Sequence, residues 1–320
     1  MSIEEIKFEA LNPAEFIAQQ VKAISEAVGD GLAINALSGG VDSSAVTMLG
    51  HKALGDRLLT IFVENGIMRQ GEAERVVSIF EGLGVPVKII DAREQFFEAL
   101  RGVTDPEAKR EAITQTFYKT VFGRLVKESG ARHLLQGTIL TDVEETVAGV
   151  KRQHNILTQL GIDTEEIYGY KVIEPLIQLR KPGVRAVASS LGLPEEITHR
   201  PPFPGPALAA RVIGEVTPER VEIVRAATAV VEEELASTGA FQYLAILHED
   251  RVTGMRNGRR DYGFQIEVRC WDSQDARTAT PTRVPYETLE RLSERIIQLP
   301  GVVSVTYNIT RKPPSTIEAI

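Results

Sequence analysis

The sequence contains a single cysteine, Cys270, in 320 residues. One cysteine excludes an intramolecular disulfide and any metal site that needs several cysteine ligands. A chain without disulfides suits a reducing compartment, so this scarcity favours a cytoplasmic protein over a secreted one.

Positive charge and long apolar segments are also scarce. Lys and Arg number 36 against 44 Asp and Glu, which gives a net charge of −8 at pH 7. An acidic chain is a poor match for nucleic acid or an anionic membrane, because both attract basic surfaces. No apolar run approaches the roughly 20 residues of a membrane helix, and the N-terminal segment lacks the basic-then-apolar order of a signal peptide. We therefore expect a cytoplasmic protein with no nucleic-acid partner and no membrane partner.

The sequence has the balance of a globular protein, with 43% hydrophobic and 25% charged residues. Apolar runs at residues 32–37, 58–63, 85–90 and 133–136 alternate with amphipathic stretches at 13–28, 43–54, 72–83 and 106–128. This alternation predicts an α/β fold with a doubly wound parallel sheet and helices on both faces. In such a sheet the ligand lies beyond the carboxyl ends of the strands.

A proline-rich segment, RPPFPGP at residues 200–206, interrupts this pattern. Several prolines remove backbone donors and fix φ, so we place a domain boundary here, between residues 1–203 and 204–320. Beyond it, helical patterns at 218–237 and 286–298 mix with strand-like runs at 243–247, 263–269 and 302–309. They lack regular strand–helix spacing, which predicts a smaller α+β domain.

A glycine- and serine-rich loop follows the first predicted strand. It consists of Ser38, Gly39, Gly40, Val41, Asp42, Ser43 and Ser44. Two glycines let the backbone turn sharply and present N–H groups to an anion, and the next helix adds its N-terminal dipole. Asp42 adds negative charge, which fits if Mg²⁺ bridges its carboxylate and a pyrophosphate. A capping turn without a ligand would explain a lone Ser-Gly-Gly but not the whole run after a strand, so we interpret it as a pyrophosphate-binding loop.

The run SGGVDSS resembles the pyrophosphate loop of the N-type ATP pyrophosphatases, which cleave ATP between the α- and β-phosphates. It differs from the GxxxxGK[ST] loop, whose lysine serves γ-phosphate chemistry. The superfamily includes GMP synthetase, NAD synthetase, asparagine synthetase, argininosuccinate synthetase and tRNA-thiolating enzymes. The loop alone does not distinguish among them.

Motifs elsewhere resemble GMP synthetases in particular. The chain reads FVENG at residues 62–66, GVTDP at 102–106, QGTI at 136–139 and EPL at 174–176. It continues with PFPGP at 202–206, then Arg211 and GEVT at 214–217, and closes with KPPSTIE at 312–318. The PFPGP and KPPSTIE runs are very similar to segments specific to GMP synthetases, and the resemblance covers essentially the whole chain.

The resemblance implies an activity. The O2 of xanthosine 5′-monophosphate (XMP) would attack the α-phosphate of ATP, magnesium pyrophosphate would leave into the loop, and ammonia would displace AMP to give GMP. ATP and Mg²⁺ are the implied cofactors. Such an acceptor needs cations for its phosphate, which Arg211 and Lys312 can supply.

The resemblance also implies the site residues. Asp42 and Lys151 would be catalytic, and the loop would bind ATP and pyrophosphate together with Val63, Gly137 and Thr138. The acceptor would be bound by Arg211, Pro204, Gly205, Lys312, Thr316 and Glu318, and Mg²⁺ by Asp42, Asp142 and Glu145. Because the family dimerises through its C-terminal domain, we also expect a homodimer.

No ammonia-producing domain is evident. A glutaminase of the expected class needs a nucleophilic cysteine, whereas Cys270 lies in a strand-like run, VRCW, without a glycine elbow. We interpret it as a core cysteine. Either a separate glutaminase subunit or free ammonia would then supply the nitrogen.

Several positions depart from the family pattern. The lid segment at residues 150–160 has Gln153 in place of a histidine and lacks a Gly-Gly-Leu-Pro run, Ala207 replaces a glycine, and Asn308 replaces an aspartate. The run LHED at 247–250 replaces an apolar segment. These changes leave two alternatives open: a ligase with a different acceptor, and a nucleotide-binding paralogue without turnover. Intact Asp42 and Lys151 argue against the second.

Overall fold

The computed structural model describes residues 3–147, 169–201, 203–274 and 276–319, without the side chains of 145–147. The chain divides into two compact units. The first comprises Met1–Glu64, Glu72–Asp91 and Phe117–Arg200, and the second comprises Asn65–Gly71, Ala92–Thr116 and Pro201–Ile320. The main division, between Arg200 and Pro201, lies near the boundary predicted after residue 203. That domain boundary stays a prediction. Two short upstream segments, Asn65–Gly71 and Ala92–Thr116, group with the second unit.

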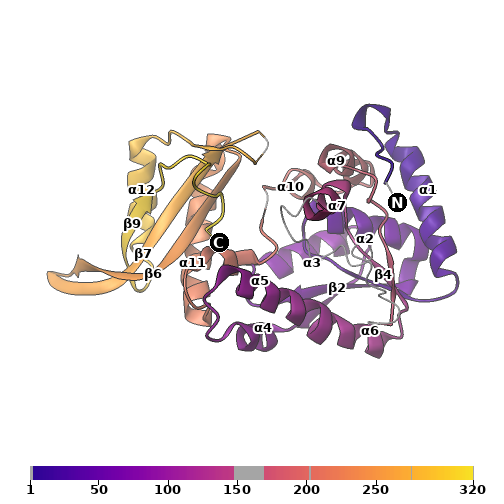
Figure 1. Ribbon diagram of the computed structural model, residues 1–320, viewed down its shortest axis with the longest axis horizontal. Helices are drawn as coiled ribbons and strands as arrows, with labels where there is room; N and C mark the ends of the chain where they lie inside the picture. Colours follow the sequence, from indigo (N-terminus) through magenta and orange to yellow (C-terminus); the bar gives the residue numbers. More distant parts are fainter. Residues whose placement is uncertain (1–2, 148–168, 202, 275, 320) are drawn as a thin grey trace. The chain divides into compact units, whose positions relative to one another are not determined.

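A five-stranded parallel sheet forms the centre of the first unit (Figure 1). Its strands are β1 (Ala33–Ala36), β2 (Leu58–Glu64), β3 (Val87–Asp91), β4 (His133–Leu135) and β5 (Lys171–Ile173), in the order β3-β2-β1-β4-β5. All four neighbouring pairs are parallel. The predicted α/β class with a doubly wound sheet is confirmed. The strand order reverses between β1 and β4, which is where such sheets bind ligands.

Helix α2 (Val41–Leu54) packs against β2, β4, α1 (Pro13–Val28) and α9 (Lys181–Ser190). Because it is covered on several sides, residues 44–50 are all buried. Gly50 permits the close approach to the sheet, since an added Cβ would lie 2.6 Å from Leu135 Cδ2 and 2.9 Å from Leu58 Cδ2.

The helix predicted over residues 106–128 is divided in the structure. It consists of α5 (Pro106–Gln115), a π-helical segment (Thr116–Phe122) and α6 (Gly123–Ser129). Phe117 stacks on Phe122 at 6.0 Å between ring centroids and meets Tyr118 edge-on at 5.0 Å. The wider turn accommodates this aromatic group. A periodic apolar pattern does not distinguish π from α winding at this length.

Further helices are α3 (Glu72–Gly82), α4 (Arg93–Leu100), α7 (Leu140–Val147) and α10 (Glu195–Thr198), with 3₁₀ turns at Phe8–Ala10, Gly55–Arg57, Ala207–Arg211 and Ala236–Thr238. Within the described residues, no helix combines the length and the apolar character needed to cross a membrane.

The second unit contains a long antiparallel ribbon of β6 (Gln242–Arg256) and β7 (Arg259–Asp272), joined by Asn257-Gly258 with φ of +54° and +75° (Figure 1). Strand β7 also pairs with β8 (Thr280–Pro281) and, in parallel, with β9 (Val302–Tyr307). Helix α11 (Pro218–Leu235) packs against β6, and α12 (Tyr286–Ile296) packs against β9. Strands β6 and β7 extend beyond the runs predicted at 243–247 and 263–269, because only the buried half of the ribbon carries an apolar pattern. Strand β9 ends two residues before the end of the run predicted at 302–309.

Candidate functional site

The loop of residues 38–44, predicted to bind phosphate, leaves the carboxyl end of β1 and enters α2. Gly39 has φ of +77°, and an added Cβ would lie 2.7 Å from Val76 Cγ2. Only glycine fits this conformation and this space. Gly40 is the N-cap of α2. The N–H groups of a first helical turn point out of the helix end, so those of α2 point toward the loop, as expected for an anion site.

Serine hydroxyls close the loop on itself. The Oγ atoms of Ser38 and Ser43 lie 2.9 Å apart, and the Ser38 N–H donates to Ser43 Oγ at 3.2 Å. Ser43 Oγ in turn lies within donating distance of the Gly40 carbonyl, at 3.0 Å. The loop therefore has a defined shape in the protein alone.

A buried chain of hydrogen bonds connects the loop to strands β1 and β2 of the sheet. Thr60 Oγ1 on β2 donates to Asn35 Oδ1 on β1 at 2.9 Å. Asn35 Nδ2 donates to Thr47 Oγ1 at 2.6 Å, and Thr47 Oγ1 donates to the Ser43 carbonyl at 2.8 Å. Thr60, Asn35 and Thr47 are all buried. Two strands of the sheet thus fix the first turn of α2.

Asp42 has one paired and one unpaired oxygen. Its Oδ2 accepts from Lys181 Nζ at 2.6 Å. Its Oδ1 is buried and, like the Oγ of the fully buried Ser44, has no hydrogen-bond partner among the described residues. Buried polar atoms normally have partners, and Mg²⁺ prefers oxygen ligands of this kind. Asp42 therefore fits the predicted metal role.

Two cations beside the loop were not predicted. Lys181 begins α9, and Arg200 forms a two-point pair with Glu72 at 2.5 Å for both contacts. Arg200 Nη1 also lies 3.4 Å from the Gly39 carbonyl. Arg200 begins the RPPFPGP segment, which was interpreted only as a domain boundary, and no motif marks Lys181. Lys181 follows the short strand β5, whose carboxyl end lies at the ligand edge of the sheet, but that strand was itself not predicted.

Gly137 and Thr138 follow β4, the strand beside β1. An added Cβ on Gly137 would lie 3.0 Å from the Ser43 N, so this glycine lets the two loops touch. Thr138 is fully buried and accepts from Gln136 Nε2 at 3.2 Å. Val63, near the carboxyl end of β2, is 8% exposed. The structure places these residues at one edge of the sheet, while their contact with ATP remains a prediction.

The other predicted metal and catalytic residues are described only in part. Asp142 Oδ2 accepts from the Ile139 N–H at 3.1 Å at the start of α7. The side chain of Glu145 and all of Lys151 lie outside the described residues, as does the altered lid. Among the residues that are described, no group of three or more His, Cys, Asp or Glu could hold a metal. The three-carboxylate metal set thus stays a prediction.

In the second unit, the structure brings Arg211 and Glu318 together. Arg211 Nε and Nη2 donate to the two carboxylate oxygens of Glu318 at 3.1 and 3.2 Å. Gln242 Nε2 also donates to Glu318, at 2.8 Å. The Arg211 guanidinium carbon lies 5.0 Å from the centroid of the Phe203 ring. Two predicted acceptor residues, 107 positions apart, thus form one ion pair, in which Arg211 is buried and Glu318 is partly exposed.

The remaining predicted acceptor residues lie in the same unit. Lys312 Nζ donates to the Ala276 carbonyl at 2.7 Å, and Thr316 Oγ1 donates to the Glu318 carbonyl at 2.6 Å. The Pro204 carbonyl accepts from the Ala207 N–H at 2.9 Å, which closes a turn that includes Gly205. Ala207 has φ of +51°, the left-handed region that favours glycine. This agrees with the resemblance, in which a glycine occupies the position.

Two departures from the family pattern share one partner. Glu267 Oε2 lies 2.8 Å from His248 Nε2, and its Oε1 accepts from Asn308 Nδ2 at 2.8 Å and from Arg269 Nε at 2.6 Å. Burial alone would raise the pKa of Glu267, but the hydrogen bonds from His248, Asn308 and Arg269 outweigh it and hold that pKa at about 2. An aspartate at position 308 could not donate to this carboxylate.

Cys270 is 1% exposed, and burial raises the pKa of its thiol. A buried thiol of high pKa is a poor nucleophile. The interpretation of Cys270 as a core cysteine agrees with this position.

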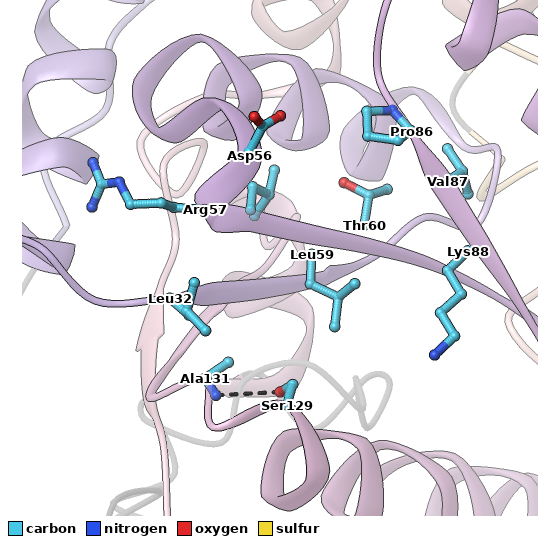
Figure 2. A pocket seen from close by; sticks show the side chains of 11 residues that line it. Leu32, Asp56, Arg57, Leu59, Thr60, Pro86, Val87, Lys88, Ser129 and Ala131 are labelled. Atoms are coloured by element: carbon cyan, nitrogen blue, oxygen red, sulfur yellow. Dashed lines mark hydrogen bonds between the residues drawn. The ribbon is translucent and has the colours of Figure 1, made fainter.

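A cavity of about 480 Å³ lies at the opposite edge of the parallel sheet (Figure 2). Leu58, Leu59 and Val87 line it at the starts of β2 and β3. Asp56, Arg57 and Lys88 are its charged residues. None of the predicted site residues lines this cavity, so the candidate site remains at the carboxyl edge.

The comparisons with known proteins agree with this geometry. The GMP synthase C terminal domain matches residues 229–319, and the NAD synthase family matches residues 13–205. A GMP synthase [glutamine-hydrolyzing] subunit of Archaeoglobus fulgidus is 49% identical over 306 residues, which cover 95% of this chain and 98% of the relative. The corresponding subunit in Pyrococcus furiosus is 46% identical over 95% of this chain and 96% of its own length, and that of Methanopyrus kandleri is 44% identical over 96% and 99%.

Proposed function

Because the chain belongs to the GMP synthase family, we propose that it forms GMP by ATP-dependent amination of XMP. It is a carbon–nitrogen ligase that releases AMP and pyrophosphate. The observation that carries the proposal is the preformed phosphate loop, in which two buried oxygens, Asp42 Oδ1 and Ser44 Oγ, have no partner among the described residues.

In the first step, the O2 of XMP attacks the α-phosphorus of ATP. The bond from that phosphorus to the bridging oxygen breaks, and pyrophosphate leaves with the electron pair. The N–H groups at the start of α2 face the departing anion, and Lys181 adds a positive charge beside Asp42. Preorganised donors of this kind stabilise charge that develops during the reaction.

Mg²⁺ would be held by Asp42, with Asp142 and Glu145 as further proposed ligands, and when bound it neutralises charge on the phosphates. Lys181 occupies Oδ2 of Asp42 and leaves Oδ1 available. Lys151 is proposed to neutralise phosphate charge from the lid.

In the second unit, the XMP phosphate needs fixed cations, and we propose Arg211 and Lys312 for it. Pro204, Gly205, Thr316 and Glu318 would complete the acceptor site. The pair between Arg211 and Glu318 orients both side chains before the acceptor arrives. Such orientation supplies part of the catalysis by positioning the reactants.

In the second step, ammonia attacks C2 of the adenylylated base, the bond from C2 to O2 breaks, and AMP leaves. Surplus protons pass to solvent. The relatives carry the name of one subunit of a glutamine-hydrolysing GMP synthase, so we propose that a separate glutaminase subunit supplies the ammonia, with free ammonia as a substitute. We also propose a cytoplasmic homodimer that associates through the C-terminal domain.

The direct test is to incubate the purified chain with ATP, Mg²⁺, ammonium and XMP, and to measure AMP, pyrophosphate and GMP. We expect the three products in equal amounts. ATP binding without AMP formation in the presence of XMP contradicts the proposed acceptor.

Asp42→Ala tests the loop. We expect GMP formation to fall at least about 100-fold, because the phosphates lose their metal ligand. Asp56→Ala, at an exposed acid without an ion pair among the described residues, is the matched control and should retain activity. Full activity of Asp42→Ala contradicts the metal role.

A further inference from the structure

Lys109 is a fully buried lysine whose ammonium reaches the segment after Arg211. It lies on α5, is 1% exposed, and its Nζ donates to the Val212 carbonyl at 2.8 Å. Within the described residues, Lys109 forms no ion pair. Burying a charge without an ionic partner is costly, so a stability role alone does not explain it.

Val212 directly follows Arg211, the buried cation of the proposed acceptor site. Two nitrogens of Arg211 bind Glu318, but Nη1 is buried and has no partner among the residues that the structure describes. A buried donor left unpaired in the protein is suited to a ligand. The direction in which Arg211 Nη1 points depends on the backbone conformation at residues 211 and 212.

The segment after Val212 is held as well. The Ile213 N–H donates to the Leu247 carbonyl at 2.9 Å, and Arg220 donates to the carbonyls of Ile213 and Glu215 at 2.5 Å each. Glu215 Oε1 accepts from the Gly102 N–H at 2.7 Å. Lys109 supplies the contact nearest to Arg211 in this set, because it binds the adjacent residue.

We propose that Lys109 is a positioning residue for the acceptor: by fixing the Val212 carbonyl, its ammonium holds Arg211 with Nη1 free for the acceptor. This inference rests on the proposed function. It adds Lys109, three residues after the GVTDP run at 102–106, as a residue that acts through Val212 without touching the acceptor.

If the Lys109 ammonium positions Arg211, the affinity for the acceptor depends on pH. Burial, and then the charge of Arg220 on α11, lower the pKa of Lys109 to about 8, while Glu249 on β6 and Asp105 before α5 raise it. A charged donor binds a carbonyl more strongly than a neutral one. The affinity for XMP should therefore fall as the pH rises through 8.

The experiment compares the wild-type chain with Lys109→Met and with Lys127→Met, a control at an exposed lysine. XMP affinity is measured by titration calorimetry from pH 7 to 9.5 without ATP or ammonia, and the KM values for XMP and ATP are measured at pH 7.5. We expect Lys109→Met to raise the Kd and KM for XMP about ten-fold. The KM of Lys109→Met for ATP should stay within about two-fold of the wild-type value. The part of the loss of XMP affinity above pH 8 that depends on Lys109 should be absent from this variant.

Glu249→Gln keeps the inference testable if Lys109→Met does not fold. It removes an exposed charge that raises the pKa of Lys109, so the alkaline loss of XMP affinity should move to lower pH. An unchanged XMP affinity in Lys109→Met, or equal alkaline profiles in wild type and Glu249→Gln, overturns the inference. If the wild type forms GMP, the proposed function survives that result; if it neither binds XMP nor forms GMP, both fail.

Discussion

At the scale of single residues, Gly39 gives the sharpest prediction. Gly39→Ala places a Cβ 2.7 Å from Val76 Cγ2 and 3.1 Å from Glu72 Oε1, at φ of +77°. We expect a loss of about 2 kcal/mol in the free energy of unfolding, because left-handed strain and the clash add. The first step of the reaction, in which ATP is cleaved to AMP and pyrophosphate, should be lost as well. Thermal unfolding and AMP formation measure the two effects.

Gly82→Ala is the control for that substitution. Gly82 ends α3, and an added Cβ would meet nothing within 4 Å. We expect wild-type activity and stability within about 0.5 kcal/mol. Equal behaviour of the two alanine variants would contradict the role assigned to Gly39.

Glu267 predicts how stability depends on pH. Its pKa in the folded state is about 2, below the ordinary value of 4.5. Its contribution is therefore present above pH 4.5 and is lost as the pH falls from 4.5 to 2, with an upper bound of about 3 kcal/mol. In Glu267→Gln this acid-sensitive part disappears, whereas Glu290→Gln, at an exposed acid, should follow the wild type. Urea unfolding between pH 2.5 and 6 measures the free energy of unfolding of each variant. If that free energy falls with pH in the same way in the wild type and in Glu267→Gln, the role assigned to Glu267 is contradicted.

At the scale of elements, the hydrogen-bond chain behind the loop joins β2, β1 and α2. Thr47→Val preserves shape but removes the donor to the Ser43 carbonyl and the acceptor for Asn35 Nδ2. We expect a loss of about 1–3 kcal/mol in the free energy of unfolding. The KM for ATP should rise, since the first turn of α2 loses its support.

Thr114→Val is the matched control, because Thr114 Oγ1 also donates to the carbonyl four residues earlier, at 2.7 Å, but on α5 in the second unit. Its KM for ATP should match the wild type. If both variants raise that KM equally, the chain behind the loop has no specific role.

Regular elements were predictable where period and burial agree. Helix α1 (Pro13–Val28) has the predicted bounds, because Asn12 caps it and Pro13 begins it. The strand β5 was not predicted, because three residues give no usable period. The ten-residue helix α9, which follows it in the chain, was not predicted either. Because β5 was not predicted, Lys181 could not be placed near the loop, since its position follows from β5 and not from any motif.

At the scale of the whole molecule, the source of nitrogen can be tested with Cys270. The thiol is buried and its pKa is raised, so the chain should not hydrolyse glutamine itself. We expect ammonium to support GMP formation, glutamine to fail unless a glutaminase subunit is added, and Cys270→Ala to retain ammonium-dependent activity within about two-fold. Glutamine-dependent GMP formation by the isolated chain would falsify this assignment.

The departures from the family pattern also need this scale. From the sequence, Asn308 and His248 are separate changes that leave the acceptor open. In the structure both contact the carboxylate of Glu267. An internal network on β6, β7 and the segment after β9 therefore accounts for these two positions.

The sequence by itself determined the parallel sheet and the family, and it predicts phosphate binding at residues 38–44, because loop chemistry and strand periodicity are local properties. Only the tertiary structure decided which cations lie beside the loop and which groups contact Arg211 and the residue after it. Lys181 lies 139 residues from Asp42, and Lys109 lies 103 residues from Val212. Such pairs form when the chain folds back on itself, and no local pattern records them. The loop and the acceptor residues are therefore predictable from the sequence, whereas the groups that contact them are decided by packing.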